Sequence, residues 1–350
     1  MKPIKSVKIG SVTLGQGQPI AIQSMTNVNT ADIPAAKAQI QALSDAGCDI
    51  VRLAVPDEAA AKAMEVLRKS SPVPLVADIH FDYRLALMCI ERGVSKIRIN
   101  PGNIGGEEKA KAVAEAARKA GIPIRIGVNG GSLEAGLLEK NDGNLARAMV
   151  ESAKRHVEIL NRYDFDDIVL SMKSSTVKTT IEAYRFAREE FPYPLHLGVT
   201  EAGTYQDGVV KSAIGIGALL ADGIGETIRV SLTDDPVREA EVARRILKAL
   251  DLGGNRVQVV SCPTCGRTKI DLIAIAKAIS DAVENIPAKL KVAVMGCVVN
   301  GPGEAKDADI GIAGGDGCGV LFKKGEILRK IPENQIIPEL LAEIEKMIKE

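Results

Sequence analysis

The chain has 350 residues, a length that predicts two domains or one large domain with a smaller one. Its 45 Lys and Arg residues balance its 45 Asp and Glu residues, and it has five Tyr, five Phe and no Trp, so neither a basic excess nor stacking aromatics indicate nucleic-acid binding. No apolar run approaches the roughly 18 residues of a membrane span, and the N-terminus lacks the apolar core of a signal peptide. We therefore expect a cytoplasmic protein without membrane contact, whose cysteines stay reduced.

One unit recurs up to about residue 250: a β-branched run, a polar or glycine-bearing loop, and an alanine-rich helical pattern. The eight strand candidates centre on Ile22, Val51, Val76, Ile97, Ile126, Val169, Leu197 and Ile228. The helical patterns between them include Pro34–Ala46, Glu58–Lys69, Glu107–Ala120, Leu145–Arg162 and Pro236–Leu250. Eight such units predict an α/β fold, a (β/α)8 TIM barrel, over residues 1–252. A doubly wound open sheet is the alternative, because the pattern alone does not close the sheet.

A second, smaller unit is predicted over residues 253–350, after the helix stop and linker at Asp251–Asn255. Its expected elements are strands at Arg256–Val260, Lys291–Met295 and Asp309–Ile312, helices at Lys269–Glu284 and from about Gln335, and a hairpin around Lys323–Gly325. This pattern predicts a small α/β domain.

Four of the predicted barrel strands carry an arginine inside an apolar run: Arg52, Arg98, Arg125 and Arg229. Parallel strands of this class are normally continuous in Val, Ile and Leu, and a buried guanidinium is costly unless it is paired. One interpretation is internal ion pairing with Asp or Glu. The other is that the arginines converge at the carboxyl ends of the strands, where barrel enzymes bind their substrates, and hold a multiply charged anion such as a diphosphate.

Further polar residues end the same strands, and together they predict a polar, cationic mouth. They are Asp78, His80, Asn100, Asn129, Lys173, His196, Thr200, Glu201 and Ser231. Glu201 is the odd acid there, either a proton donor or a salt-bridge partner of one arginine. No glycine fingerprint for NAD, FAD or a nucleoside triphosphate is present.

Four of the six cysteines fall in the last 90 residues: Cys262 and Cys265 in a CxxC, then Cys297 and Cys318. A redox pair leaves the third cysteine unused, and half a zinc site lacks its second ligand pair. An iron–sulfur cluster uses Cys262, Cys265 and Cys297, with Cys318 or a ligand other than cysteine as the fourth. The residues alone leave these three alternatives open, with the cluster favoured.

The longest motifs resemble one family. Ser-Cys-Pro-Thr-Cys-Gly-Arg stands at 261–267 and Met-Gly-Cys-Val-Val-Asn-Gly-Pro-Gly-Glu at 295–304. These segments, and barrel segments such as Arg-Ile-Asn-Pro-Gly-Asn-Ile-Gly at 98–105 and His-Leu-Gly-Val-Thr-Glu-Ala-Gly at 196–203, resemble the 4-hydroxy-3-methylbut-2-enyl diphosphate synthases, the GcpE or IspG family. The resemblance runs along essentially the whole chain and fits the short bacterial form.

The resemblance implies a [4Fe–4S] cluster on Cys262, Cys265, Cys297 and Glu304, which sets Cys318 aside. It implies reductive ring opening of 2-C-methyl-D-erythritol 2,4-cyclodiphosphate to (E)-4-hydroxy-3-methylbut-2-enyl diphosphate in the non-mevalonate isoprenoid pathway, with ferredoxin or flavodoxin as the electron donor. The expected diphosphate-binding residues are Arg52, Asp78, Arg98, Asn100, Arg125, Asn129, Lys173, Thr200, Arg229 and Ser231. We expect Glu201, with His80 or His196, to protonate the departing hydroxyl.

The topology adds a prediction of assembly. The last barrel helix ends near Leu250 at the amino-end face of the barrel, and only a five-residue linker follows it. We therefore expect a head-to-tail homodimer, in which each cluster domain caps the barrel of the other chain. Two rival functions remain, a cluster-free barrel of the dihydropteroate-synthase type and a zinc-binding module without catalysis.

Overall fold

The structure is a computed structural model that describes residues 2–100, 104–299 and 305–349. It divides into two units, Met1–Leu252 and Gly253–Glu350, and each is described here by itself. The division falls inside the Asp251–Asn255 segment; the preceding helix ends at Ala249, and Asp251 follows it with a positive φ of 57°.

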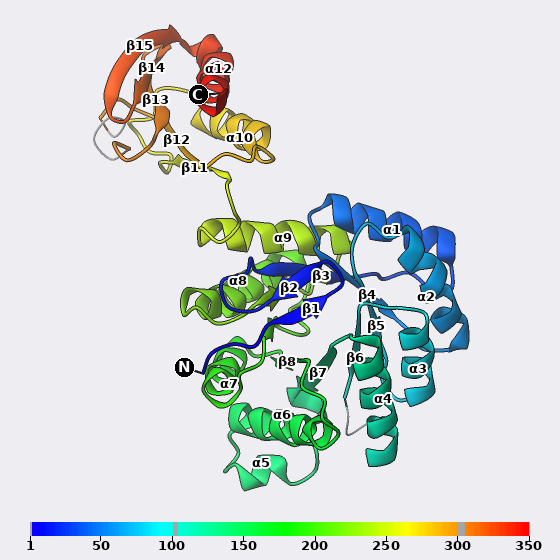
Figure 1. Ribbon diagram of the computed structural model, residues 1–350. Helices are drawn as coiled ribbons and strands as arrows, with labels where there is room; N and C mark the ends of the chain where they lie inside the picture. The colour runs from blue at the N-terminus through cyan, green and yellow to red at the C-terminus, as the bar shows by residue number, and fades with distance from the viewer. Residues whose placement is uncertain (1, 101–103, 300–304, 350) are drawn as a thin grey trace. The chain divides into compact units, whose positions relative to one another are not determined.

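Eight parallel strands form the sheet of the first unit (Figure 1). They are β3 (Ala21–Met25), β4 (Ile50–Ala54), β5 (Leu75–Asp78), β6 (Lys96–Ile99), β7 (Ile124–Asn129), β8 (Ile168–Lys173), β9 (His196–Leu197) and β10 (Thr227–Ile228). Their order is β8-β7-β6-β5-β4-β3-β10-β9, and a parallel bridge between Leu170 and Leu195 joins the two ends of that row. The sheet therefore closes on itself, so the predicted TIM barrel is confirmed and the open sheet is excluded.

Helices follow the strands and surround the barrel in Figure 1. They are α1 (Ile33–Asp45), α2 (Glu58–Ser70), α3 (Tyr83–Glu91), α4 (Glu107–Ala120), α6 (Leu145–Asn161), α7 (Val177–Glu190), α8 (Tyr205–Ala221) and α9 (Pro236–Ala249), with the short η1 (Gly130–Ser132) and α5 (Leu137–Lys140) between β7 and α6. Aspartates cap several of them; the Asp57 side chain, for example, accepts a hydrogen bond from the Ala60 amide at the start of α2. In the described ranges, no helix combines the length and the apolarity that crossing a bilayer requires.

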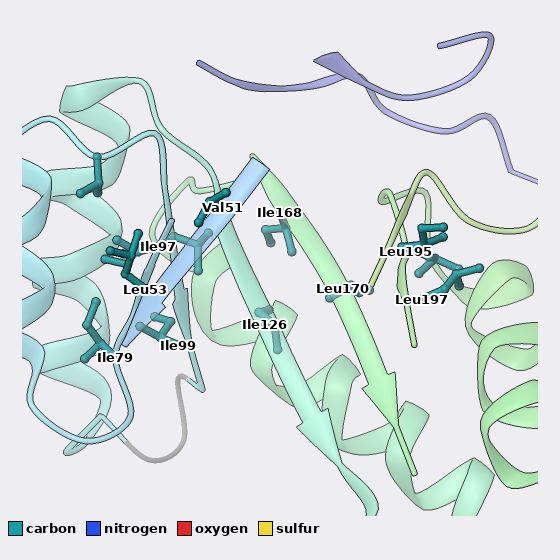
Figure 2. Packing of buried hydrophobic residues seen from close by; sticks show 14 of the residues in the cluster. Val51, Leu53, Ile79, Ile97, Ile99, Ile126, Ile168, Leu170, Leu195 and Leu197 are labelled. Atoms are coloured by element: carbon teal, nitrogen blue, oxygen red, sulfur yellow. The ribbon is translucent and has the colours of Figure 1, made fainter. Parts of the chain in front are cut away.

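Alternate residues of each strand face the helix layer. Val51 and Leu53 of β4 belong to one buried apolar cluster with Ala60 and Met64 of α2, and Figure 2 shows the equivalent side chains of neighbouring strands. Because successive side chains of a strand point to opposite faces, the residues between these positions, such as Arg52, face the interior of the barrel.

A short N-terminal hairpin, β1 (Val7–Ile9) and β2 (Val12–Leu14), closes one end of the barrel interior. Its Ile9 and Leu14 side chains are fully buried. They pack with residues at the beginnings of four barrel strands: Ala21, Ile50, Val76 and Val169. The sequence analysis did not predict this hairpin, which occupies the end of the barrel opposite to the carboxyl ends of the strands.

In its described residues, 253–299 and 305–349, the second unit is a five-stranded mixed sheet with two helices. The strands are β11 (Val257–Ser261), β12 (Leu290–Met295), β13 (Ile310–Gly315), β14 (Cys318–Lys323) and β15 (Glu326–Pro332), in that order across the sheet. The helices are α10 (Leu272–Val283) and α12 (Ile336–Lys349), the latter preceded by the turn η2 (Glu333–Gln335). The predicted hairpin around Lys323–Gly325 is the antiparallel connection between β14 and β15. The predicted small α/β domain is therefore confirmed.

Candidate functional site

The barrel interior is cationic. In the described strands β4 to β8, the inward-facing positions hold five basic side chains and one acidic side chain, Asp78. The basic residues are Arg52, Lys96, Arg98, Arg125 and Lys173, all of them buried. Four of these were predicted to bind substrate from the sequence. Lys96 was not, although it stands two residues before Arg98 and therefore on the same face of β6.

Asp78 is the acid that orders two of the arginines. Its carboxylate lies 3.3 Å from Nη1 of Arg98 and 3.8 Å from Nε of Arg52. His80 lies beside both groups, with a ring nitrogen 3.4 Å from Asp78 and the other 3.2 Å from Arg98. Burial raises the pKa of Asp78, but Arg52, the His80 hydrogen bond and Arg98 together hold that pKa far below its usual range. The carboxylate is thus negative at neutral pH, and it is placed to align both arginines.

Two other interior cations, Arg125 and Lys96, have neutral partners. Arg125 donates from Nη1 to the Ser171 hydroxyl at 2.6 Å, and Lys96 donates to the Gln23 side-chain oxygen at 3.0 Å. Arg52, besides its ion pair with Asp78, donates to the Met25 sulfur, a weak acceptor, at 3.0 Å. Nε of Arg98 and Nε of Arg125 are buried without a hydrogen-bond partner in the described part of the chain. An interior with five basic side chains and one carboxylate is what a bound polyanion compensates.

Burial and the repulsion between neighbouring cations lower the pKa values of basic groups in the barrel interior. Burial lowers the pKa of Lys173 well below its usual range, and Arg229, Arg125 and Arg52 lower it further. The same causes, burial first and then Lys173 and Arg125, lower the pKa of His196. His196 is fully buried, with Nδ1 3.4 Å from the Thr227 hydroxyl. A neutral buried ring is a hydrogen-bonding group of the barrel interior, which disfavours His196 as the proton donor.

Two glycines make room for the cations. A Cβ atom on Gly127 of β7 would lie 2.9 Å from Nε of Arg98. A Cβ atom on Gly198, after β9, would lie 2.7 Å from Nζ of Lys173 and 2.6 Å from the Arg229 carbonyl oxygen. The Arg98 and Lys173 side chains therefore lie against strand backbone where any other residue type would displace them.

The other predicted binding residues stand where the strands end. Asn100 and Asn129 lie at the ends of β6 and β7, and both are half-buried, as are Thr200 and Ser231 in the loops after β9 and β10. Glu201 is exposed in the loop after β9 and has a positive φ of 51°. A non-glycine residue with that backbone conformation is strained, and such strain concentrates at functional sites.

In the second unit, the loops after β11 and β12 bring two predicted cluster ligands close. The Gly296 amide donates to the Cys262 sulfur at 3.2 Å, and Gly296 precedes Cys297. Cys265 is exposed in the same loop as Cys262, and the backbone hydrogen bond from Arg267 lowers the pKa of its thiol. Cys262 also lines a cavity of 340 Å³ together with Pro263.

The fourth predicted ligand, Glu304, lies outside the described residues. Within residues 2–100, 104–299 and 305–349, no three His, Cys, Asp or Glu side chains converge closely enough to hold a metal ion. The donor set still fits a cluster in its chemistry, since soft thiolates on adjacent loops are the ligands that iron–sulfur clusters use. An amide directed at sulfur, as Gly296 is toward Cys262, stabilises a thiolate.

Comparison with known sequences agrees with both units. The family described as the GcpE TIM-barrel domain matches residues 4–244, and that described as the GcpE protein C-terminal domain matches residues 258–346. A relative from Caldanaerobacter subterraneus is 58% identical over 349 residues, which are 100% of this chain and 98% of the relative. One from Ruminiclostridium cellulolyticum is 56% identical, covering 98% of this chain and 97% of the relative. Both are named 4-hydroxy-3-methylbut-2-en-1-yl diphosphate synthase (flavodoxin).

Solved structures show the same barrel at low identity. The spore coat polysaccharide biosynthesis protein spsE of Bacillus subtilis is 12% identical with a TM-score of 0.51, over 71% of this chain and 74% of that one. The 7,8-dihydropteroate synthase of Vibrio fischeri is 12% identical with a TM-score of 0.50, over 70% of this chain and 98% of that one. These likenesses show the fold alone, whereas the family matches and the full-length identities show that the chain belongs to the GcpE family.

Proposed function

We propose that the chain is a 4-hydroxy-3-methylbut-2-enyl diphosphate synthase. It takes 2-C-methyl-D-erythritol 2,4-cyclodiphosphate, two electrons and two protons, and it releases (E)-4-hydroxy-3-methylbut-2-enyl diphosphate and one water. Relatives that are 58% and 56% identical over nearly their full length carry that enzyme name, which makes an oxidoreductase of this type the best-supported activity.

The cationic barrel interior is the observation that carries the proposal. Five buried basic residues face inward on β4 to β8 against the one carboxylate of Asp78. A cyclic diphosphate supplies the missing negative charge, and arginine forks match its phosphate oxygens in geometry. Arg52, Arg98, Lys173 and Arg229 bind it from the strand ends, with Asn100, Asn129, Thr200 and Ser231 as neutral donors. Arg125 lies among them, charged but less accessible.

We place proton delivery in the loops that follow the carboxyl ends of the barrel strands. The Glu201 carboxyl is exposed after β9, where it can exchange protons with solvent before substrate closes the site. We assign it the proton that leaves with the hydroxyl group as water. His80 is also exposed, and it contacts both Asp78 and Arg98. His80 therefore holds the arginine that binds phosphate and is the second candidate donor.

We assign cluster binding to Cys262, Cys265, Cys297 and Glu304 in the second unit. A [4Fe–4S] cluster held there supplies single electrons to the ring-opening reaction. The family name of the relatives specifies flavodoxin, so flavodoxin is the donor that we propose, with ferredoxin as the alternative. A cytoplasmic location remains our prediction, supported by six cysteines without disulfide partners.

We also propose the head-to-tail homodimer. The carboxyl end of α9 leads to a short linker, and α9 with its 14 residues is about 21 Å long. The α8 helix offers an apolar surface for association, since Val210 and Ile214 lie one turn apart and are 57% and 54% exposed.

The test begins with anaerobic purification, an absorbance spectrum, and iron and sulfide analysis. We expect a broad thiolate-to-iron band in the visible range and about four irons per chain, followed by turnover of the cyclodiphosphate with a chemical reductant. A colourless protein with stoichiometric zinc supports a zinc module instead. Colourless, metal-free protein that binds a diphosphate supports the cluster-free barrel.

A further inference from the structure

A second buried carboxylate lies next to the proposed diphosphate site, on a helix rather than on a strand. Glu239 is in the first turn of α9, and it is only 4% exposed. Neither the arginine pattern nor the strand ends single it out in the sequence. A carboxylate is seldom buried without a purpose, because its desolvation is costly unless hydrogen bonds compensate.

The Glu239 carboxylate joins three different segments of the barrel. One oxygen accepts from the Ser24 hydroxyl of β3 at 2.8 Å and lies 3.4 Å from Nε of Arg229. The other oxygen accepts from the Leu232 amide at 3.0 Å. Glu239 thus fixes both ends of the segment 229–232, which also contains Ser231, between strand β10 and its helix.

Arg229 belongs electrostatically to the cationic interior. The pKa of Arg52 is lowered to about 10, chiefly by burial, and the Arg229 charge is among the causes of that lowering, whereas Asp78 opposes it. Burial likewise lowers the pKa of Lys173. The Arg229 charge lowers that pKa further, and the Glu239 charge raises it. The ion pair with Glu239 engages Nε of Arg229, so the two terminal nitrogens remain the ones that a phosphate can engage in a fork.

We propose that Glu239 is a positioning residue for substrate binding, which holds Arg229 and the 229–232 segment in the orientation that binds the diphosphate. This inference rests on the proposed function. Asp78 orders Arg52 and Arg98 from one side of the barrel, and Glu239 does the same for Arg229 from the helix layer. Glu239 does not contact the substrate, and it acts only through Arg229 and the segment that carries Ser231.

The test variant is Glu239→Gln, which preserves size and one acceptor but removes the charge that faces Arg229. Inorganic pyrophosphate is the probe, titrated into the full-length, cluster-loaded protein by calorimetry. We expect pyrophosphate affinity to fall about 10-fold, the effect of losing one charge-assisted hydrogen bond. We expect KM for the cyclodiphosphate to rise by a similar factor while kcat changes much less.

Glu226→Gln is the matched control. Glu226 is also a buried carboxylate, bonded to Arg188 at 3.2 Å and to the Leu195 amide at 2.6 Å, but it precedes β10 whereas Glu239 contacts residues after it. We expect both variants to lower the melting temperature and only Glu239→Gln to change KM. A merely structural Glu239 predicts the same profile for both.

Coupling to Arg229 gives the second criterion. In an Arg229→Met background, Glu239→Gln should weaken pyrophosphate binding less than it does in the wild type, because the part of its effect that acts through the Arg229 side chain is already lost. Additive losses, or an unaltered KM in Glu239→Gln, overturn the inference while leaving the proposed function intact. Wild-type protein that neither binds pyrophosphate nor turns over substrate overturns both.

Discussion

Glu201 tests the assignment of the proton donor at the scale of one residue. Glu201→Gln keeps the shape of the side chain and its exposed place after β9 but has no acidic proton to deliver. We expect kcat to fall by about 100-fold or more, the usual contribution of general acid catalysis. The absorbance of the cluster should not change, because Glu201 is not one of the proposed cluster ligands. Turnover and spectrum are measured on the same anaerobic sample, and a fully active variant removes Glu201 from the mechanism.

Gly127 tests whether the barrel interior is shaped around Arg98. A methyl group at this position meets the flexible end of the Arg98 side chain at 2.9 Å, and not the backbone. Gly127→Ala should therefore displace the guanidinium at little cost to stability, so we expect KM to rise several-fold with a nearly unchanged melting temperature. Arg98→Met provides the reference: adding Gly127→Ala to it should change nothing more. An Ala variant with wild-type KM shows that Arg98 is not needed in this position.

Lys96 links the cationic interior to the pH dependence of stability. Burial lowers its pKa well below the usual value, and Arg125 and Arg52 lower it further. The relevant pH range lies between the pKa of Lys96 in the folded protein and about 10.4, its pKa in the unfolded chain. In that range the unfolded chain binds more protons at Lys96 than the folded protein does, so the free energy of unfolding rises with pH. We expect Lys96→Met to lose that increase, so that the wild type gains relative to the variant from pH 7 to pH 10. Urea unfolding of both proteins at several pH values measures the difference, and parallel curves contradict it.

At the scale of elements, the barrel could be predicted because each strand candidate is a compact apolar run between a loop and a helix. All eight predicted centres, from Ile22 to Ile228, lie in strands β3 to β10. The sequence did not decide which way Arg52 and its equivalents face, because a buried run with one charge fits either face. In the structure, Val51 and Leu53 belong to the apolar cluster that packs against the helices, so Arg52 between them faces the barrel interior.

Two interior residues that the sequence analysis did not predict differ in how far the sequence could have identified them. Lys96 could have been found from its spacing to Arg98, since both share one face of β6. Glu239 could not, because it is an ordinary acid in the first turn of a helix and only the tertiary fold brings it to Arg229. The hairpin β1–β2 was missed because its strands have three residues each, too few for a periodic signal.

The N-terminal hairpin yields a prediction about stability without activity. Ile9 and Leu14 are fully buried against the beginnings of the barrel strands. Leu14→Ala should cost about 2–5 kcal/mol of unfolding free energy, the range for a buried leucine that leaves a cavity. KM should stay constant at temperatures where the variant is folded, since the substrate site is predicted at the opposite strand ends. Denaturant unfolding and steady-state kinetics on the same variant test both parts, and a raised KM contradicts the separation.

At the scale of the whole molecule, the proposed head-to-tail dimer predicts that a site uses the barrel of one chain and the cluster of its partner. Two inactive variants test this: Glu201→Gln, with a defective barrel, and Cys297→Ser, with a defective cluster domain. In a mixed dimer with exchanged domains, the intact barrel of one chain meets the intact cluster of the other. Random reassociation at equal amounts should therefore restore about a quarter of wild-type activity, because half of the dimers are mixed and each has one working site.

The double variant Glu201→Gln/Cys297→Ser, mixed with wild type, is the control for this experiment. If the sites are shared between chains, a mixed dimer has two defective sites. One combines the wild-type barrel with the defective cluster domain of the double variant, and the other combines the defective barrel with the wild-type cluster domain. Mixed dimers are therefore inactive. If each chain serves its own barrel, wild-type chains keep their activity in mixed dimers and the two single variants never complement each other. The two mixtures thus give opposite results under the two arrangements, so loss of complementation together with retained activity in the control means that each chain works alone.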